Sequence, residues 1–160
     1  MMLVTFGKHK GKSLETLVIK EPDYIKWVLD QYAAEGPLAK LREEAVRLTS
    51  IFDNKPILRQ CLGHQCTKRS VRFTAYTGVW SPLYYWCAKC DPYEQGALKG
   101  KLTVLTRYRE ALQHVEFSCY GDKAGYKAII RDIALAKGLP QRSGESQVES
   151  FFHKAIGHGT

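Results

Sequence analysis

The chain has 160 residues, of which 44% are hydrophobic and 25% charged, a composition typical of a globular protein and unlike that of a disordered one. No apolar run approaches the roughly 18 residues of a membrane span, and the first residues lack the apolar stretch of a secretory signal. We therefore expect a cytoplasmic protein with no membrane partner. The net charge of +8 favours an anionic partner, of which nucleic acid is the commonest.

The first third of the chain predicts a short strand and three helices. Apolar and β-branched residues over 2–6 predict the strand, and residues 13–19 predict a brief helical turn. A helix over 23–31 begins after a proline and ends before Gly and Pro at 36–37, which start the next one. In this third helix the apolar residues recur three or four positions apart, as in an amphipathic helix, at Leu38, Leu41, Ala45, Leu48 and Phe52.

The rest of the chain predicts one hairpin and three more helices. β-forming residues over 71–86, interrupted at a Thr-Gly pair, predict the hairpin. Helical spacing returns over 105–115, and a further helix over 122–137 ends at the sequence Gly-Leu-Pro. Ser146 with Glu149 predicts a capping box that begins a last short helix.

Four of the five cysteines form two close pairs, C-x4-C and C-x2-C, and twenty residues that include the predicted hairpin separate them. The paired residues are Cys61, Cys66, Cys87 and Cys90. Four ligands at tetrahedral corners are what a structural Zn²⁺ needs, and such a site leaves no position open for catalysis. His64 could replace Cys66 as a ligand, but four thiolates are favoured. Cys119 stands alone and is expected to be a buried apolar residue.

Two small zinc folds fit this order of elements. The module is a zinc ribbon if the second pair forms a knuckle, and a treble clef if residues 90–94 begin a helix. Pro92 and the acidic residues beside it favour the helix, and hence the treble clef. The predicted fold class is α+β, mostly helical with a small zinc-bound β-hairpin centre, in three modules over 1–53, 54–100 and 101–160.

No acidic residue lies between Asp53 and Asp91, whereas the same window holds six lysines and arginines and several aromatic residues. Cations bind phosphates and flat rings stack on unpaired bases, so the mixture suits single-stranded or distorted DNA. The alternative is that the cations balance the net negative charge of a zinc tetrathiolate and the rings form the hairpin core. The nucleic-acid contacts expected here are Lys68, Arg69, Arg72, Tyr76, Trp80 and Tyr84.

A second basic segment, FGKHKGKS, occupies residues 6–13. Its two glycines have three residues between them, one fewer than in a phosphate-binding P-loop. Lys8, Lys10 and Lys12 alternate, so an extended segment would point all three to one side. We therefore expect these lysines to contact a phosphate backbone and not to cradle a nucleotide.

FGKHKGK at 6–12, followed by EPDYIKWVL at 21–29, resembles the small C-terminal domain of exodeoxyribonuclease X-like proteins. A similar module occurs in short stand-alone proteins, including some called quorum-sensing-regulated virulence factors. The likeness covers about residues 3–35. It implies an accessory module that helps bind DNA, with Tyr24 and Trp27 packed under the Gly/Lys loop. It implies no catalysis, because the exonuclease active site belongs to a separate acidic domain.

The sequence thus predicts a zinc-stabilised, nucleic-acid-binding accessory protein without catalytic activity, and DNA is the favoured ligand. One alternative is a protein–protein adaptor whose zinc module meets an acidic protein partner. The other is a small metal-dependent nuclease, which the scattered histidines do not favour because they form no metal-binding or nucleophile motif.

Overall fold

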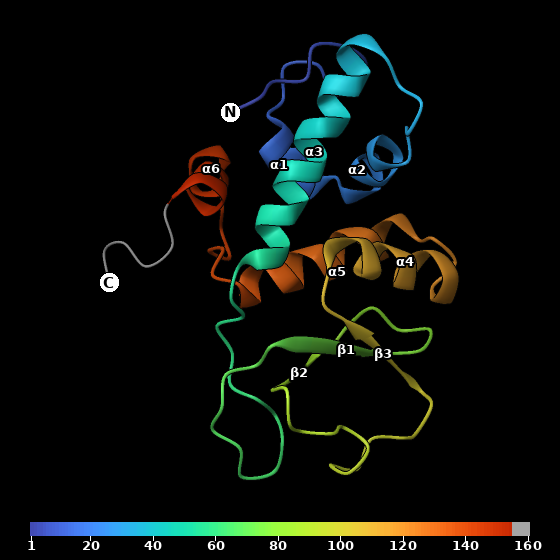
Figure 1. Ribbon diagram of the computed structural model, residues 1–160, viewed down its shortest axis with the longest axis vertical. Helices are drawn as coiled ribbons and strands as arrows, with labels where there is room; N and C mark the ends of the chain where they lie inside the picture. Colours follow the sequence, from blue (N-terminus) through green and yellow to red (C-terminus); the bar gives the residue numbers. More distant parts are fainter. Residues whose placement is uncertain (155–160) are drawn as a thin grey trace.

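The structure is a computed structural model that describes residues 1–154. Figure 1 shows the arrangement along the longest axis: the first three helices lie at one end, a small sheet lies at the other, and two further helices cross between them. The fold class is α+β and mostly helical, as predicted.

The helices of the described chain form close to where the apolar periodicity predicts them. They are α1 (Leu14–Lys20), α2 (Pro22–Leu29), α3 (Gly36–Asn54), α4 (Tyr108–Ser118), α5 (Lys123–Ala136) and α6 (Glu145–His153). The stripe predicted on α3 faces inward, with its last four members buried. In the part of the chain that the structure describes, none of these helices combines the length and apolar character that crossing a membrane requires.

The sheet contains β1 (Arg72–Tyr76), β2 (Tyr84–Trp86) and β3 (Leu102–Leu105) in the order β2-β1-β3, with both pairs antiparallel. The first two strands confirm the predicted hairpin. The third was not predicted, because the helical spacing was taken to begin at Leu105. That residue instead ends β3 opposite Phe73, and the helix starts three residues later.

One continuous hydrophobic core joins the helices to the inner face of the sheet. Phe73, Ala75 and Leu105 contribute the side chains of that face. The buried hydroxyl of Tyr108 donates a hydrogen bond to the carbonyl of Val18 at 2.7 Å, which ties α4 to α1. The sheet is therefore fixed to the helical body through its inner face, whereas its other face carries the buried Thr74 and Trp86 and the partly exposed Tyr76 and Tyr84. Residues 155–160 of the last predicted module lie outside the described part of the chain.

Two local predictions were wrong. Residues 2–6 form no strand; a single bridge joins Leu3 to Ser13, because the turns between them leave no longer antiparallel partner. Helix α6 does not begin at a Ser146 capping box. Its N-cap is Gly144, whose N–H donates to the side-chain oxygen of Gln147 at 2.9 Å, so Ser146 lies within the first turn.

Candidate metal centre and nucleic-acid interface

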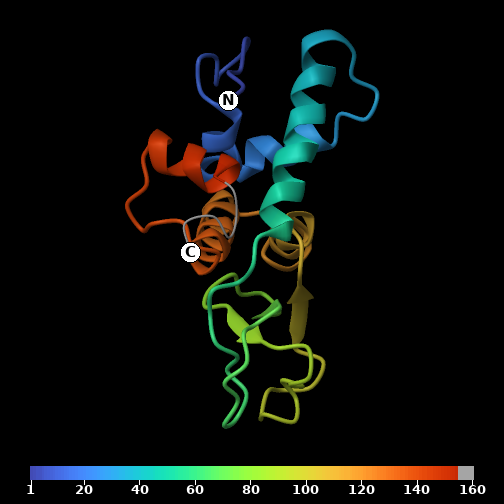
Figure 2. The same ribbon diagram turned by 60° about the vertical axis from the view of Figure 1, so that its left-hand side comes forward.

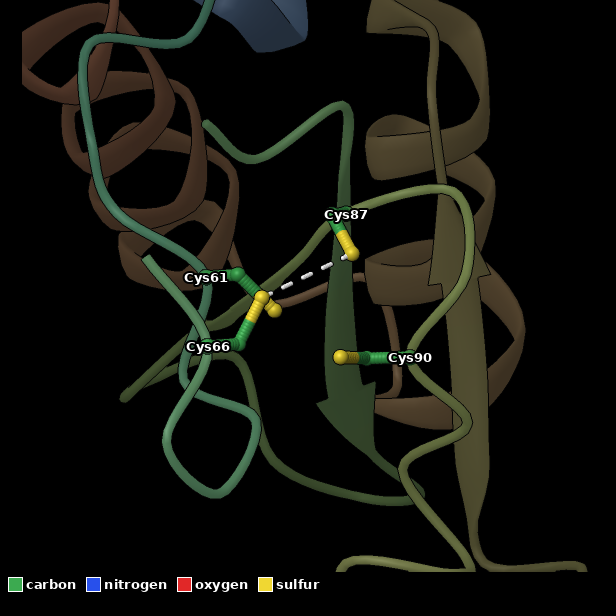
Figure 3. Close-up of side chains that lie close together, drawn as sticks. All are labelled: Cys61, Cys66, Cys87 and Cys90. Carbon is green, nitrogen blue, oxygen red and sulfur yellow. Dashed lines mark hydrogen bonds between the residues drawn. The ribbon is translucent and has the colours of Figure 1, made fainter. Parts of the chain in front are cut away.

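The two cysteine pairs meet at the outer end of the sheet. Figure 3 shows Cys61 and Cys66 on one loop facing Cys87 and Cys90 on another. All four sulfurs lie within 4.8 Å of one another, and the Cys66 and Cys87 sulfurs are 3.9 Å apart. Four sulfurs bound to one tetrahedral zinc at about 2.3 Å lie about 3.8 Å from each other. The cluster therefore has the dimensions of a four-thiolate metal site, and its cysteines form no disulfide.

The first loop folds as a knuckle around this space. The N–H of Gly63 donates to the sulfur of Cys61 at 3.3 Å, and the N–H of Cys66 donates to the carbonyl of Gly63 at 3.1 Å. A Cβ at position 63 would lie 2.5 Å from the sulfur of Cys90 and 3.4 Å from that of Cys61. Only glycine leaves room for the sulfurs here. Sequence reasoning missed Gly63, although its position between the first two cysteines was a usable signal.

The pKa values of two thiols shift in opposite directions. The backbone N–H of Lys89, helped by that of Cys90, lowers the pKa of Cys87 to about 6 although burial opposes the change. Hydrogen bonds of the Cys90 thiol with the sulfurs of Cys61 and then Cys87 favour its protonated form and raise its pKa to about 12, and repulsion from the Cys61 sulfur makes a smaller contribution. A divalent cation at the centre would offset this repulsion and allow all four cysteines to be deprotonated. The donor set thus fits a metal ion.

The arrangement around the second pair is consistent with a zinc-ribbon-like module, and the helix that favoured a treble clef does not form. Residues 92–96 after Cys90 form turns and no helix, and the chain then continues into β3. Gly96 and Gly100 both have positive φ angles, which end any helix in this short segment. His64 is exposed and does not belong to the group of clustered metal-ligand atoms, which consists of the four cysteines.

One hydrogen bond joins the cluster to the sheet, and a second fixes the tryptophan that packs against the cysteines. The guanidinium of Arg72 donates to the carbonyl of Cys90 at 2.6 Å, and the indole N–H of Trp86 donates to the hydroxyl of Thr74 at 2.8 Å. Trp86 and the partly buried Tyr84 also pack against the cysteines. Arg72 therefore connects β1 to the second knuckle, so its side chain has a structural partner already.

The outer face of the sheet carries two of the three predicted stacking residues. Tyr76 and Tyr84 are both partly exposed, and their rings meet edge to face with centroids 5.7 Å apart. Trp80 lies elsewhere: it packs against the helical core, and a Cβ on Gly125 of α5 would come within 2.7 Å of its indole. The structure thus brings the two tyrosines together and separates them from the tryptophan.

The cations around the cysteine cluster have no carboxylate partners. Residues 55–101 contain eight lysines and arginines against two acidic residues. Every ion pair found within residues 1–154 lies in the helical part, and none uses a cation from this segment. Lys68 and Arg69 after the first knuckle and Lys89 in the second are exposed. Their positive charge is therefore available to an external anion.

The N-terminal loop is compact, in contrast to the extended segment that was predicted. The N–H of Val4 donates a hydrogen bond to the carbonyl of Lys12 at 2.9 Å, and the N–H of Gly11 donates one to the carbonyl of Val4 at 2.8 Å. Gly7 and Gly11 have φ angles of 76° and 88°, which the turns require and which side chains disfavour. The three lysines predicted to contact phosphates, Lys8, Lys10 and Lys12, are all exposed on this loop.

His9 holds the loop in place, a role that sequence reasoning did not assign. Its side chain is buried and meets the ring of Tyr24 edge to face at 4.6 Å, and Tyr24 in turn lies 5.9 Å from Trp27. Burial lowers the pKa of His9, and the charge of Lys12 adds to the effect, so the ring is neutral near pH 7. Figures 1 and 2 show this loop and the sheet at opposite ends of the molecule.

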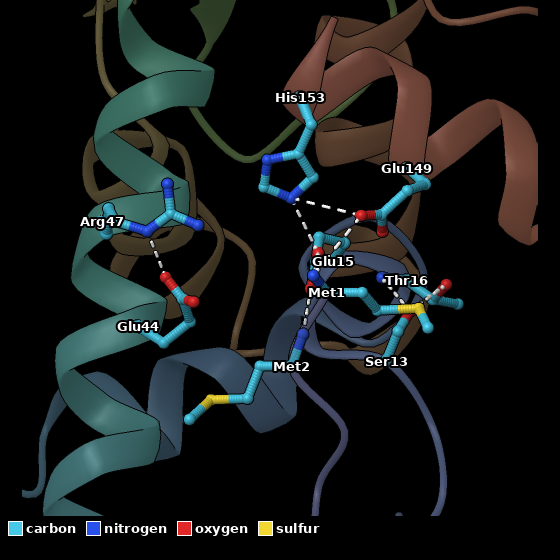
Figure 4. Close-up of polar contacts among 9 residues, drawn as sticks. All are labelled: Met1, Met2, Ser13, Glu15, Thr16, Glu44, Arg47, Glu149 and His153. Carbon is cyan, nitrogen blue, oxygen red and sulfur yellow. Dashed lines mark hydrogen bonds and ion pairs between the residues drawn. The ribbon is translucent and has the colours of Figure 1, made fainter.

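A second group of ionisable side chains joins α1 to α6. The buried Glu15 accepts a hydrogen bond from the Nε2 of His153 at 2.8 Å, and Glu149 lies 3.5 Å from the same nitrogen (Figure 4). Burial by itself raises the pKa of Glu15, but the hydrogen bonds from His153 and from backbone N–H groups outweigh it and lower the pKa overall. These contacts already satisfy the buried carboxylate, so we regard the group as structural.

Comparison with known proteins gives one match. No curated protein and no solved structure matches the chain in the corresponding searches. The four-cysteine cluster is consistent with a zinc-ribbon-like module. The family model described as "Exodeoxyribonuclease X-like C-terminal" matches residues 4–32, which confirms the resemblance predicted for the N-terminal segment.

Proposed function

We propose that this chain is a zinc-stabilised, non-catalytic, nucleic-acid-binding accessory protein of the cytoplasm, and that single-stranded or distorted DNA is its preferred ligand. The observation that carries the proposal is the group of cations without carboxylate partners around the cysteine cluster. Polyanions bind such surfaces with release of counterions, whatever their sequence.

Zinc is the metal that suits this site best. Tetrahedral four-sulfur sites hold zinc or iron–sulfur centres, and short knuckles on a small sheet are the usual setting of structural zinc. Bound zinc would fix the two loops that carry Lys68, Arg69 and Lys89 to the same end of the sheet. Its role would be structural, because four protein ligands leave no position for water or substrate.

The contacts divide between phosphates and bases. Lys68 and Arg69 are exposed beside the first knuckle and would bind phosphates, whereas Arg72 would support the site through the Cys90 carbonyl. Tyr76 and Tyr84 would offer their partly exposed rings to unpaired bases. Stacking on aromatic rings tolerates any base, which suits an accessory protein without sequence preference.

The N-terminal loop supplies a second, separate contact in this proposal. The family match over residues 4–32 supports it, since Lys8, Lys10 and Lys12 all lie within that segment. Because the loop and the sheet lie at opposite ends of the long axis, a short oligonucleotide would occupy one of them at a time. A longer strand would gain affinity by binding both ends, through the raised effective concentration of the second site.

Fluorescence anisotropy of labelled DNA and RNA tests the proposal. Zinc-loaded protein is compared with three variants: Lys68→Ala with Arg69→Ala, the triple alanine variant of Lys8, Lys10 and Lys12, and a control with Lys40→Ala and Lys154→Ala. The first two should bind more weakly, and the slope of log K against log salt should flatten by about 0.7 per lost contact on single strands. The control should keep both affinity and slope.

Two results would redirect the interpretation. Equal affinity and slope for all four proteins would remove both basic surfaces from nucleic-acid binding and would favour an adaptor for an acidic protein. Cleavage of the labelled strands in the presence of Mg²⁺ or Mn²⁺ would contradict the non-catalytic role and would favour a nuclease.

A further inference from the structure

A cavity of about 610 Å³ opens between the C-terminal end of α1, one face of α5 and the connection from α5 to α6. Figure 2 shows this connection swinging out beside α5 before it turns into α6. The volume falls within the roughly 300–1,000 Å³ of small-molecule sites. The cavity is distant from the cysteine cluster in sequence and fold, and the proposed function makes no use of it.

Four cations line this cavity, and no acidic residue lines it. They are Lys20, Lys127, Arg131 and Arg142. Lys127 and Arg131 lie four positions apart on one face of α5, where like charges destabilise a helix. The carboxylate of Glu21 beside Lys127 offsets part of this repulsion, and an anion bound near Arg131 would offset more of it.

Of these four cations, the guanidinium groups of Arg131 and Arg142 are the ones free to bind a ligand, because both lysines already have a partner. Lys20 already donates to the carbonyl of Ser143 at 2.9 Å, and Lys127 lies 3.7 Å from the carboxylate of Glu21. Arg131 and Arg142 are exposed and make no hydrogen bond or ion pair with any of residues 1–154. A guanidinium binds phosphate oxygens through two parallel hydrogen bonds, so phosphate is the anion these side chains suit best.

The remaining lining is apolar. Ile19, Leu135, Leu139 and Pro140 form it, and the first and third of these are buried. Inorganic phosphate would leave most of this surface uncovered. A ligand that combines a phosphate with a flat, largely apolar ring would contact both parts of the lining.

We propose that this cavity binds a nucleotide, with the phosphate on Arg131 and Arg142 and the base against the side chains of Leu135 and Pro140. The nucleotide is either free or the phosphorylated end of a strand, and the strand-end form rests on the proposed nucleic-acid function. The phosphate chemistry is the same in both forms.

Isothermal titration of the full, zinc-loaded chain distinguishes these forms. The probes are 5′-dTMP, thymidine, inorganic phosphate, and hexathymidylate with a 5′-phosphate or a 5′-hydroxyl. The variant is Arg131→Gln with Arg142→Gln, and Lys123→Gln on the same helix but outside the cavity is the control. All three substituted side chains are exposed, so the fold should persist, which circular dichroism verifies.

We expect 5′-dTMP to bind at least tenfold more tightly than thymidine or inorganic phosphate. The double variant should lose roughly tenfold or more for each guanidinium, and the control should bind like the original chain. Binding of the phosphorylated hexamer without binding of 5′-dTMP would support the strand-end form. Equal binding of phosphorylated and unphosphorylated probes, or no loss in the double variant, would overturn the inference.

The proposed function and this inference can be rejected independently of each other. If the Lys68→Ala, Arg69→Ala protein loses binding to long strands while 5′-dTMP binds nowhere, the sheet interface stands and the nucleotide cavity is rejected. If 5′-dTMP binds through the two arginines while no variant at the sheet or the N-terminal loop alters strand binding, the cavity stands and the proposed interface is rejected.

Discussion

Replacing Gly63 with alanine should disable the metal site while leaving all four cysteines in place. The new Cβ would lie 2.5 Å from the sulfur of Cys90. An ordinary contact between such atoms is about 3.5–4.0 Å, so one of the two must move by about 1 Å. Metal–ligand distances tolerate about 0.2 Å, so the displaced sulfur could not remain a good ligand.

The expected loss of metal affinity is at least the 10- to 100-fold that supporting residues around a metal site usually contribute. At a fixed free zinc concentration, a 100-fold loss removes up to about 2.7 kcal/mol of metal-linked stability. For a chain of this size that corresponds to a fall in melting temperature of about 5–10 °C. Competition with a chromophoric chelator measures the affinity, and calorimetry measures the melting temperature.

His64→Ala is the matched control, because the exposed His64 lies next to Gly63 on the same loop and is not among the clustered ligand atoms. It should retain both the affinity and the melting temperature of the original chain. Unchanged zinc affinity in the Gly63→Ala protein would refute the sulfur geometry described above. Loss of zinc in the His64→Ala protein would show that the histidine, and not all four cysteines, completes the site.

Three further substitutions test the helical body. The buried side chain of Lys137 donates a hydrogen bond to the carbonyl of Phe52 at 2.7 Å, and burial lowers its pKa from 10.5 to about 8. Between these pH values the unfolded chain holds the Lys137 proton and the folded chain has released it. The free energy of unfolding, relative to Lys137→Met, should therefore rise by up to about 3 kcal/mol between pH 8 and 10.5 in urea titrations, and parallel curves would contradict the lowered pKa. His153→Ala should cost about 1–3 kcal/mol at pH 7, because it removes a hydrogen bond from the buried Glu15. Since the pKa of Glu15 is below its ordinary 4.5 in the folded chain, that difference should be present above pH 4.5 and shrink as the pH falls below it; a difference that persists in acid would exclude the carboxylate as its source. Cys119→Ala should lower the free energy of unfolding by about 1 kcal/mol, because the buried side chain loses packing contacts. The zinc content, measured by mass spectrometry, should stay at the original value. A lower zinc content would give this buried thiol a metal-related role.

Local patterns were sufficient for most of the helices and for the clustering of the four cysteines. The apolar spacing on α3 predicted its buried stripe because a helix of ordinary geometry brings those positions to one face. The two cysteine pairs predicted a common cluster because a hairpin returns the chain to its starting point. The FGKHKGK motif predicted the N-terminal match because its glycines are needed at fixed positions in a tight turn.

Local sequence patterns could not predict which distant strands pair in the sheet. Strand β3 forms because Leu102–Leu105 meets β1 nearly thirty residues earlier in the chain, and its few residues alone resemble the start of the following helix. The choice between ribbon and treble clef also depended on the tertiary structure, since turns over 92–96 stand where the helix after Cys90 was expected and the chain then continues to β3.

The sequence by itself determined where most of the helices would lie, which cysteines would be neighbours, and that positive charge would be in excess, because each follows from spacing or composition. Only the tertiary structure decided that Gly63 must lack a side chain, that the basic loop lies at the far end from the cysteines, and that Lys20, Arg131 and Arg142 surround one cavity. These features join segments that are distant in the chain. Their positions are set by how the helices and the sheet pack on one shared core, which no local pattern encodes.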